Sequence, residues 1–366
     1  MTDDGTSPRG DAAPAGRLPG PSTPETPGRY ADLRAAVLGT GLIGGSVLLR
    51  LHTAGLDVTG WDPDPATRGH ARARGLAAPE TLDEAVRGRD VVFLCGPLPS
   101  LPETLLRVAA VTPPDCVLTD VGSTKAELAG FAARHRLLDR FVPGHPMAGA
   151  ESAGLTAASP TLLDSAAWVL CPAPGPGTLA FRWLAALVVD VFGARVVPMD
   201  AADHDAAAAL ASHVPHLLAG ALAGAVSRTP LRDAVLALAA GSFSDGTRVA
   251  GTPARRTASM LLGNRERVLA ELAGVTGYLT DLAEALRAGD GDALTALHAE
   301  AGAVRAALRG RAYGVETRDF PADGGHADEV AWLREVGAAG GHLSDCAVRP
   351  GTVAYTAHRP VRPDTA

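Results

Sequence analysis

The stretch that decides the fold is GTGLIGGS, residues 39–46. It directly follows LRAAVLG (33–39), a short apolar run typical of a buried parallel strand. In a strand–turn–helix of this kind, the first glycine, Gly39, allows a tight turn, and the second, Gly41, lets the backbone approach a pyrophosphate. The third, Gly44, lets the helix pack closely on the strand, and the free N–H groups near Leu42 and Ile43 suit phosphates. Motif and context together predict a dinucleotide-binding turn.

Strands and helices alternate on both sides of this turn. Besides 33–39, apolar runs at 57–62, 90–96, 115–123, 166–171 and 194–198 predict strands, and helical spacing occupies 42–54, 65–74, 82–87, 101–110 and 178–192. Such alternation with short loops is typical of a doubly wound α/β domain, so we predict a Rossmann-type NAD-binding domain over residues 31–198.

The remaining chain has a different character. Residues 199–312 have helical periodicity almost throughout, in segments at 201–226, 231–243, 265–287 and 290–309, which predicts an all-helical substrate and dimerisation domain. Residues 1–30 are rich in Gly, Pro, Ser and Thr, which predicts a disordered tail. The C-terminal extension, 313–366, is expected to be loop-like with one strand near 352–355.

The bulk properties narrow the class of protein. The chain has 366 residues and a net charge of -7, which argues against nucleic acid as the main partner. Its four cysteines form no Cys-x-x-Cys pair, and no signal peptide is visible, so we expect a cytoplasmic protein. The most apolar helical stretch, 217–226, is short of the ~20 residues of a membrane span, so no membrane is expected. Long Ala- and Leu-rich helices that one chain cannot cover predict a homodimer.

An acidic residue supports the nucleotide prediction. Asp62 ends the second predicted strand, 21 residues after Gly41, where a carboxylate would bond both ribose hydroxyls of NAD and repel the 2′-phosphate of NADP. No arginine follows directly, and Arg68 is the nearest. NAD is therefore the expected cofactor.

Three polar residues near predicted strand ends are candidates for chemistry. Ser123 follows the fourth strand, where ligands bind in open α/β sheets, although it could equally cap the next helix. His145 stands between Gly144 and Pro146, on a stiff backbone suited to aiming an imidazole. Glu151 could orient a histidine or a ligand, or be a solvated carboxylate.

The helical half adds further candidates. His213 and His216 are three residues apart and share a helix face, which is a spacing that metal ligands use. No suitable third ligand is obvious nearby, so metal binding is a minor alternative and no metal site is predicted. Arg248 follows a helix end, where its guanidinium could bind a carboxylate or simply suit the helix dipole.

Taken in order, these pieces resemble the prephenate dehydrogenase family of tyrosine biosynthesis over residues 34–309. The resemblance is carried by GTGLIGGS (39–46), DVGSTK (120–125), GHPMAG (144–149), and SHVPH (212–216) with His204-Asp205 ahead of it; Thr247-Arg248 and Asn264-Arg265-Glu266 fit a fifth block.

The resemblance implies NAD-dependent oxidative decarboxylation of prephenate to 4-hydroxyphenylpyruvate by a homodimer. His145 would take the proton of the C4 hydroxyl as hydride leaves C4 for NAD, and Ser123 would help to hold both groups. Arg248 would bind a substrate carboxylate, His213 would help to bind the side chain, and Glu151 would gate or orient the site. Aromatisation by loss of carbon dioxide makes the step effectively irreversible, so positioning, one proton acceptor and charge clamps suffice.

Three departures from the family pattern lie near the substrate side: Ala153-Gly154 where many members have Ser-Gly, Thr257 where many have tryptophan, and Ser244 where a basic residue is frequent. Arogenate, giving tyrosine, and an amino-substituted prephenate of a secondary pathway therefore stay open as substrates. A β-hydroxyacid or ketol-type dehydrogenase commonly uses a lysine on its helical domain, and no lysine follows Lys125. A non-enzymatic NAD sensor would need neither His145 nor Arg248.

Overall fold

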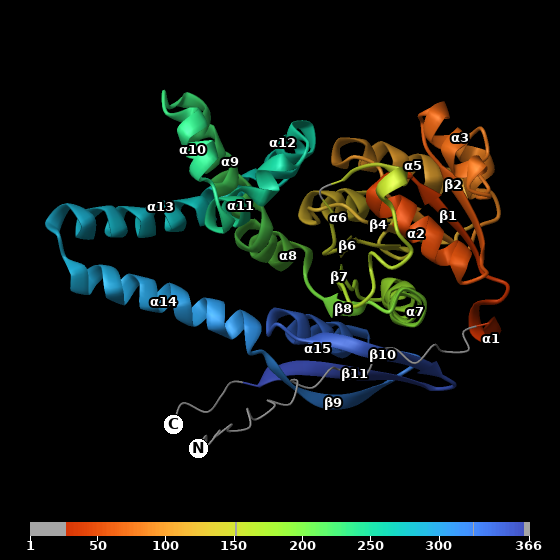
Figure 1. Ribbon diagram of the computed structural model, residues 1–366. Helices are drawn as coiled ribbons and strands as arrows, with labels where there is room; N and C mark the ends of the chain where they lie inside the picture. Colours follow the sequence, from red (N-terminus) through yellow and green to blue (C-terminus); the bar gives the residue numbers. More distant parts are fainter. Residues whose placement is uncertain (1–26, 151, 325, 362–366) are drawn as a thin grey trace, which may run out of the picture.

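A computed structural model of the chain describes residues 27–150, 152–324 and 326–361. Within it a parallel sheet carries the glycine turn, with strand order β2-β1-β3-β4-β5 (Figure 1). The strands are β1 (Arg34–Leu38), β2 (Asp57–Trp61), β3 (Val91–Leu94), β4 (Val117–Asp120) and β5 (Phe141–Val142). The helices between them are α2 (Leu42–Thr53), α3 (Pro65–Ala73), α4 (Leu82–Val86), α5 (Leu101–Val111) and α6 (Ala126–Arg134), with the short 3₁₀ turn η1 (Leu98–Ser100). The predicted Rossmann-type arrangement is confirmed.

The apolar strand runs explain why this sheet is covered on both faces. In β1, Ala35 and Val37 pack into one hydrophobic cluster, whereas Ala36 and Leu38 pack into a second cluster on the opposite face. All four side chains are buried because successive residues of a strand alternate between the two faces. The continuous apolar pattern therefore specifies a central strand.

A second, six-stranded sheet stands beside the first, in the order β6-β7-β8-β10-β11-β9. Its strands are β6 (Gly144–Pro146), β7 (Ala167–Leu170), β8 (Arg195–Pro198), β9 (Ala312–Pro321), β10 (His342–Arg349) and β11 (Thr352–Val361). Helix α7 (Pro176–Phe192) joins β7 to β8, which pair in parallel, α15 (His326–Ala338) joins β9 to β10, and η2 (Leu155–Ala157) precedes β7. The sheet thus combines strands from before and after the long helical segment at residues 201–309.

The prediction of a loop-like C-terminal extension is therefore wrong. Residues 312–361 form three antiparallel strands and a helix, and they share one hydrophobic core with α7 and β8. Trp332 and Tyr355 lie in that core, and Glu329 there forms a buried ion pair with Arg182, 2.5 Å between Oε2 and Nη2. The extension completes the sheet begun by β6–β8, so the two sheets and their helices form one α/β body from residues on both sides of the helical domain.

The N-terminal prediction also needs a correction. Residues 1–26 lie outside the described residues, but the last four residues of the expected tail form helix α1 (Pro27–Tyr30). Tyr30 is only 5% exposed, and its hydroxyl donates a hydrogen bond to Asp190 at 2.8 Å.

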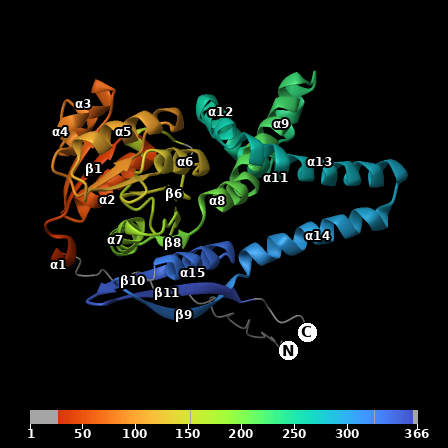
Figure 2. The same ribbon diagram turned by 180° about the vertical axis from the view of Figure 1, so that it is seen from behind.

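Residues 201–309 form the helical domain, which projects away from both sheets (Figure 2). It comprises α8 (Ala201–Ala208), the π-helical turn η3 (Ala209–His213), α9 (Val214–Arg228), α10 (Arg232–Leu238), α11 (Gly241–Thr247), the 3₁₀ turn η4 (Arg248–Gly251), α12 (Ala254–Gly263), α13 (Arg265–Ala288) and α14 (Gly291–Arg309). The expected helix at 231–243 is broken near Ala239, and α12 was not among the helical segments named from the sequence.

Much of the apolar surface of this domain is uncovered in the single chain. Leu222, Leu269, Leu286 and Leu308 are each at least 45% exposed. The continuous helix at residues 201–228 is long and apolar enough, by length and composition, to cross a membrane, and only 22% of its most apolar window is buried. The sequence estimate of a ten-residue apolar segment was therefore too short.

Candidate active site

The glycine turn has the geometry that a pyrophosphate needs. Gly39 has φ of +92°, and a Cβ atom at Gly44 would lie 2.0 Å from the carbonyl oxygen of Gly39, so neither position accepts a side chain. At Gly41 a Cβ atom would meet no heavy atom within 4 Å, which leaves open space beside the backbone. Helix α2 begins at Leu42 without a side-chain cap, so its first N–H groups are available to an anion.

Asp62 is held at the edge of this turn. Its carboxylate accepts hydrogen bonds from the backbone N–H groups of Thr40, at 2.9 Å, and Asp64, at 3.0 Å. Arg68 donates to the carbonyl oxygen of Asp62 and forms an ion pair with Glu80, 2.8 Å and 3.0 Å away. This arginine is engaged by other groups, so a carboxylate rather than a guanidinium faces the ribose position.

The strand order places the rest of the site on the other side of the turn. Because β1 lies between β2 and β3, a dinucleotide crossing its carboxyl end from Asp62 reaches the ends of β3 and β4. Ser123 follows β4, and His145 lies on β6, which pairs with β7 in the neighbouring sheet. Both residues therefore stand at the end of the site opposite to Asp62.

His145 is tied to two residues of the helical domain. Its Nδ1 lies 2.9 Å from Nε2 of His204, and Nδ1 of His204 lies 2.8 Å from Oδ1 of Asp205. The pKa of His145 is well below its usual value, chiefly because burial disfavours the charged ring and secondarily because His204 and Lys125 lie nearby. A neutral imidazole is the form that can accept a proton.

Asp205 also resolves the two interpretations of Ser123. Helix α6 begins at Ala126, and its first N–H groups are satisfied by Asp205, whose Oδ1 accepts from Lys125 at 2.7 Å and Oδ2 from Ala126 at 2.8 Å. Ser123 makes no capping hydrogen bond, so the helix-cap interpretation is wrong. Its hydroxyl is left free to face the cavity described below.

Lys125, the one lysine of the chain, is fully buried beneath the site. Its ammonium group forms an ion pair with Asp120 and donates to the carbonyl oxygen of Gly144 at 2.7 Å. A compact ammonium on a flexible stem fits such a closed space better than a planar guanidinium. Lys125 thereby links the end of β4 to the residue that precedes His145.

A cavity of about 290 Å³ lies between the α/β body and the helical domain. Ser123, His145 and Met147 line it from the first, and His216, Arg248 and Arg256 from the second. Among the described residues neither arginine forms an ion pair. The structure thus brings together three of the predicted residues, Ser123, His145 and Arg248, with two guanidinium groups free to bind carboxylates.

The other two residues predicted to contact the substrate are His213 and Glu151. His213 is 0% exposed and does not line this cavity; its Nδ1 accepts from the Asn264 side chain at 3.1 Å, and its Nε2 has no partner within the described part of the chain. Burial lowers the pKa of His213 to about 4. Glu151 lies outside the described residues, directly after Ala150, which lines the cavity.

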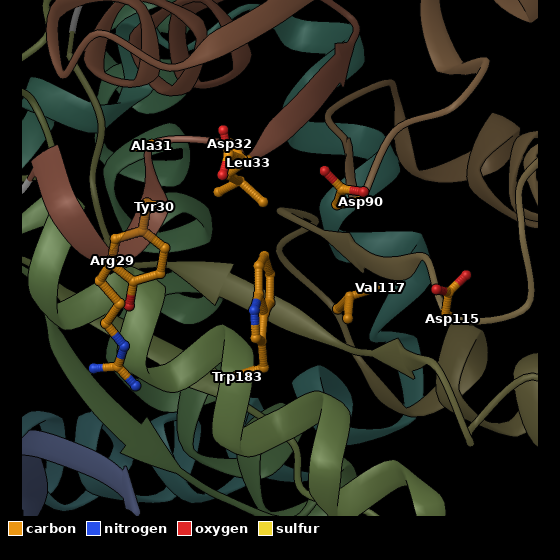
Figure 3. Close-up of a pocket in the computed structure, with 9 residues that line it drawn as sticks. All are labelled: Arg29, Tyr30, Ala31, Asp32, Leu33, Asp90, Asp115, Val117 and Trp183. Carbon is orange, nitrogen blue, oxygen red and sulfur yellow. The ribbon is translucent and has the colours of Figure 1, made fainter.

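Another cavity, of about 310 Å³, lies far from this chemistry. Figure 3 shows the residues that line it, among them Tyr30, Trp183, Asp90 and Asp115. These residues adjoin the amino ends of β1, β3 and β4, whereas ligands of open α/β sheets bind beyond the carboxyl ends. We therefore assign the candidate active site to the first cavity.

Several site residues were missed from the sequence: His204 and Asp205, Arg256, Asn264 and, as a cavity-lining side chain, His216. His204-Asp205 and Asn264 were noticed only as parts of motifs and given no role of their own. Polar residues inside an Ala- and Leu-rich helix must meet partners, which pointed to a cleft but not to individual contacts. The π-helical turn at residues 209–213 gave no such signal, although π turns frequently mark functional sites.

Comparisons with known proteins identify the family and agree with the fold. Two family models match the chain: "Prephenate dehydrogenase, nucleotide-binding domain" over residues 46–198 and "Prephenate dehydrogenase, dimerization domain" over residues 200–300. The chain is 31% identical over 284 residues to a cyclohexadienyl dehydrogenase of Zymomonas mobilis, covering 75% of this chain and 95% of that protein.

Two solved structures extend the likeness to three dimensions. A prephenate dehydrogenase of A. aeolicus, in complex with hydroxyphenyl propionate and NAD+, has a TM-score of 0.69 at 25% identity, covering 75% of this chain and 98% of that one. An arogenate dehydrogenase of Synechocystis has a TM-score of 0.64 at 27% identity, covering 75% and 100%.

Proposed function

This chain belongs to the prephenate dehydrogenase family, and from that premise we propose that it catalyses the NAD-dependent oxidative decarboxylation of prephenate to 4-hydroxyphenylpyruvate. The observation that carries the proposal is the cavity in which a neutral His145 faces Ser123 and two unpaired arginines.

The residues around the glycine turn fit NAD. Open space at Gly41 and the uncapped start of α2 suit a pyrophosphate, and the Asp62 carboxylate suits ribose hydroxyls while repelling a 2′-phosphate. When bound, NAD supplies the acceptor for the hydride that leaves C4 of the substrate ring. Glycines 39, 41 and 44, Leu42 and Ile43 would form the pyrophosphate side of the site.

The protein's own chemistry centres on one proton. Nε2 of His145 would accept the proton of the C4 hydroxyl, while the C4–H bond breaks with its electron pair. The C1–carboxylate bond then breaks, its electrons complete the aromatic ring, and carbon dioxide leaves. Ser123 would hold the hydroxyl against His145. Aromatisation supplies the driving force, so the side chains need only position the reacting groups.

Charge binds the remainder of the substrate. Arg248 and Arg256 would pair with its carboxylates, because a guanidinium matches a carboxylate with two parallel hydrogen bonds. We retain His213 as a substrate-binding residue and Glu151 as a gating or orienting residue only as proposals, since His213 would need the adjacent Ser123 segment to move.

We further propose that the protein is a cytoplasmic homodimer. The matched dimerization model covers residues 200–300, and the exposed leucines of α9, α13 and α14 lie in that range or beside it. A second copy would cover the apolar helix at 201–228. The four cysteines are all free, as expected of a reducing compartment. Static light scattering of purified protein, with Leu222→Arg as the disrupting variant, tests the dimer.

A four-way assay tests the reaction. Purified protein is mixed with NAD or NADP and with prephenate or arogenate, and the absorbance of the reduced cofactor is followed. We expect turnover with NAD and prephenate, with 4-hydroxyphenylpyruvate and carbon dioxide formed in equal amounts. No reduction in any of the four mixtures would reject the proposed function.

The same assay addresses a second substrate. Likeness to the Synechocystis arogenate dehydrogenase favours arogenate as the alternative, and its product would be tyrosine. An amino-substituted prephenate remains a third candidate because Ala153, Ser244 and Thr257 depart from the family pattern at the substrate side. The ratio of kcat/KM between substrates decides among them.

A further inference from the structure

Three side chains form a continuous hydrogen-bonded row from the cavity into the protein. His145 lines the cavity, whereas His204 and Asp205, behind it, are 2% and 3% exposed. The two links are 2.9 Å from His145 Nδ1 to His204 Nε2 and 2.8 Å from His204 Nδ1 to Asp205 Oδ1. Neither His204 nor Asp205 lines the cavity.

The protons in this row can be assigned from its inner end. Asp205 accepts two backbone N–H groups of the α6 start in addition to His204, and these donors keep its pKa below the usual value despite burial. An ionised carboxylate only accepts, so Nδ1 of His204 donates to it, and in a neutral His204 the other nitrogen, Nε2, then holds a lone pair.

The same logic continues to the cavity. Because Nε2 of His204 accepts, Nδ1 of His145 must donate, and a neutral His145 then has no proton on Nε2. Among the described residues, the hydrogen bond of the His145 ring is made by Nδ1, not by Nε2. An imidazole without this restraint could adopt the other tautomer, which offers a donor where the reaction needs an acceptor.

We propose that His204 and Asp205 are positioning residues that fix the tautomer of His145, so that its Nε2 faces the cavity as a proton acceptor. The proposal rests on the proposed function for its catalytic meaning. After proton transfer the Asp205 carboxylate would also stabilise the positive charge on His145 electrostatically, with His204 hydrogen-bonded between them. The proton itself moves only from the substrate hydroxyl to Nε2 of His145.

A purely structural role is the competing explanation, since Asp205 caps α6. The test therefore changes His204 rather than Asp205. His204→Phe removes the acceptor for His145, whereas His204→Gln can present its amide oxygen to His145 and its NH₂ group to Asp205. His52→Gln, at the exposed end of α2, is the matched control.

Two measurements are made on each full-length variant. Two-bond ¹H–¹⁵N correlation spectra of the free enzyme identify the protonated ring nitrogen of His145, assigned by comparison with His145→Asn. Steady-state kinetics with NAD and the substrate chosen by the four-way assay give kcat and KM separately. Melting temperature and NAD affinity report whether each variant is folded.

We expect His204→Phe to lower kcat roughly 10- to 100-fold with little change in KM, and to move the His145 proton partly to Nε2. His204→Gln should keep kcat within about fivefold and retain the proton on Nδ1. A folded His204→Phe variant with unaltered kcat and with His145 still protonated at Nδ1 would overturn the proposal. So would a His204→Gln variant whose kcat is as low as that of His204→Phe although His145 keeps the wild-type tautomer. Because the spectra need no substrate, an enzyme inactive in all four assay mixtures would reject the proposed function without deciding the tautomer.

Discussion

At the scale of single residues, the site depends on one uncharged base. Burial keeps His145 neutral, its Nδ1 is engaged by His204, and Ser123 and Arg248 share its cavity. Lys125 secures the backbone just before it. Each of these groups has one evident task, so single substitutions should separate binding from chemistry.

Replacing the base is the most direct prediction. His145→Asn should lower kcat by roughly two to four orders of magnitude, because asparagine cannot serve as the proton acceptor that the reaction needs. NAD affinity, measured by calorimetry, should stay within about threefold, since the glycine turn and Asp62 are untouched. An unchanged kcat would remove His145 from the mechanism.

The lowered pKa of His145 predicts the pH dependence of the reaction. A base works only when unprotonated, and a pKa below 6.5 keeps it unprotonated in more acidic solution. The acidic limb of log kcat/KM against pH should therefore fall below pH 6.5. A limb centred at or above pH 6.5 would mean that the histidine is not desolvated in the free enzyme.

At the scale of elements, local pattern specified most of the fold. The strand at 34–38 and the helix at 42–53 were predictable because continuous apolar runs and glycine spacing act within a few residues. The strand at 312–321 was not, because its side chains are mostly exposed and show no period of two. Its partner at 352–361 does alternate, with Val353, Tyr355 and Ala357 buried. This alternation of buried and partly exposed residues extends beyond 352–355, where the strand was predicted.

The same distinction holds within the site. Ser123 and His145 were predictable because they follow apolar runs, and strand ends converge at one edge of a sheet. Arg256 could not be found this way, because its position depends on how the helical domain lies against the α/β body. His213 is buried and does not line the cavity, whereas His216 does, so the substrate-binding role of His213 remains a prediction.

The contact between α2 and β1 gives an element-scale prediction. Gly44→Ala should abolish NAD binding and lower the melting temperature, because its Cβ would lie 2.0 Å from a carbonyl oxygen and force the helix away from the turn. Gly69→Ala on α3, where a Cβ meets nothing within 4 Å, is the control and should be neutral or stabilising by up to about 1 kcal/mol. Equal behaviour of the two variants would contradict this account of the turn.

At the scale of the whole molecule, buried histidines couple stability to pH. The pKa of His342 is lowered to about 4, mainly by burial and then by Arg195 and His358. Between pH 6.5 and 4 the unfolded chain binds a proton at this site that the folded protein does not, so stability falls as pH falls.

We expect His342 to contribute about 1.4 kcal/mol of lost stability per pH unit within that window. Denaturant unfolding at several pH values should show a shallower pH dependence for His342→Gln than for the wild type. His52→Gln, which replaces an exposed side chain, should leave the pH dependence of stability unaltered. An identical slope for all three proteins would show that His342 titrates alike in the folded and unfolded states.

The return of the chain to the α/β body has a mechanical consequence. The helical domain leaves that body after β8, at Pro198, and rejoins it at β9, at Ala312, so two separate covalent tethers hold it (Figure 1). A body attached at two points can swing about the line that joins them but resists twisting about other axes. We therefore expect the helical domain to rotate about the line between its two attachment points. Arg248 would then move toward and away from His145 along one path, and the gap between the two halves would open and close as a hinge.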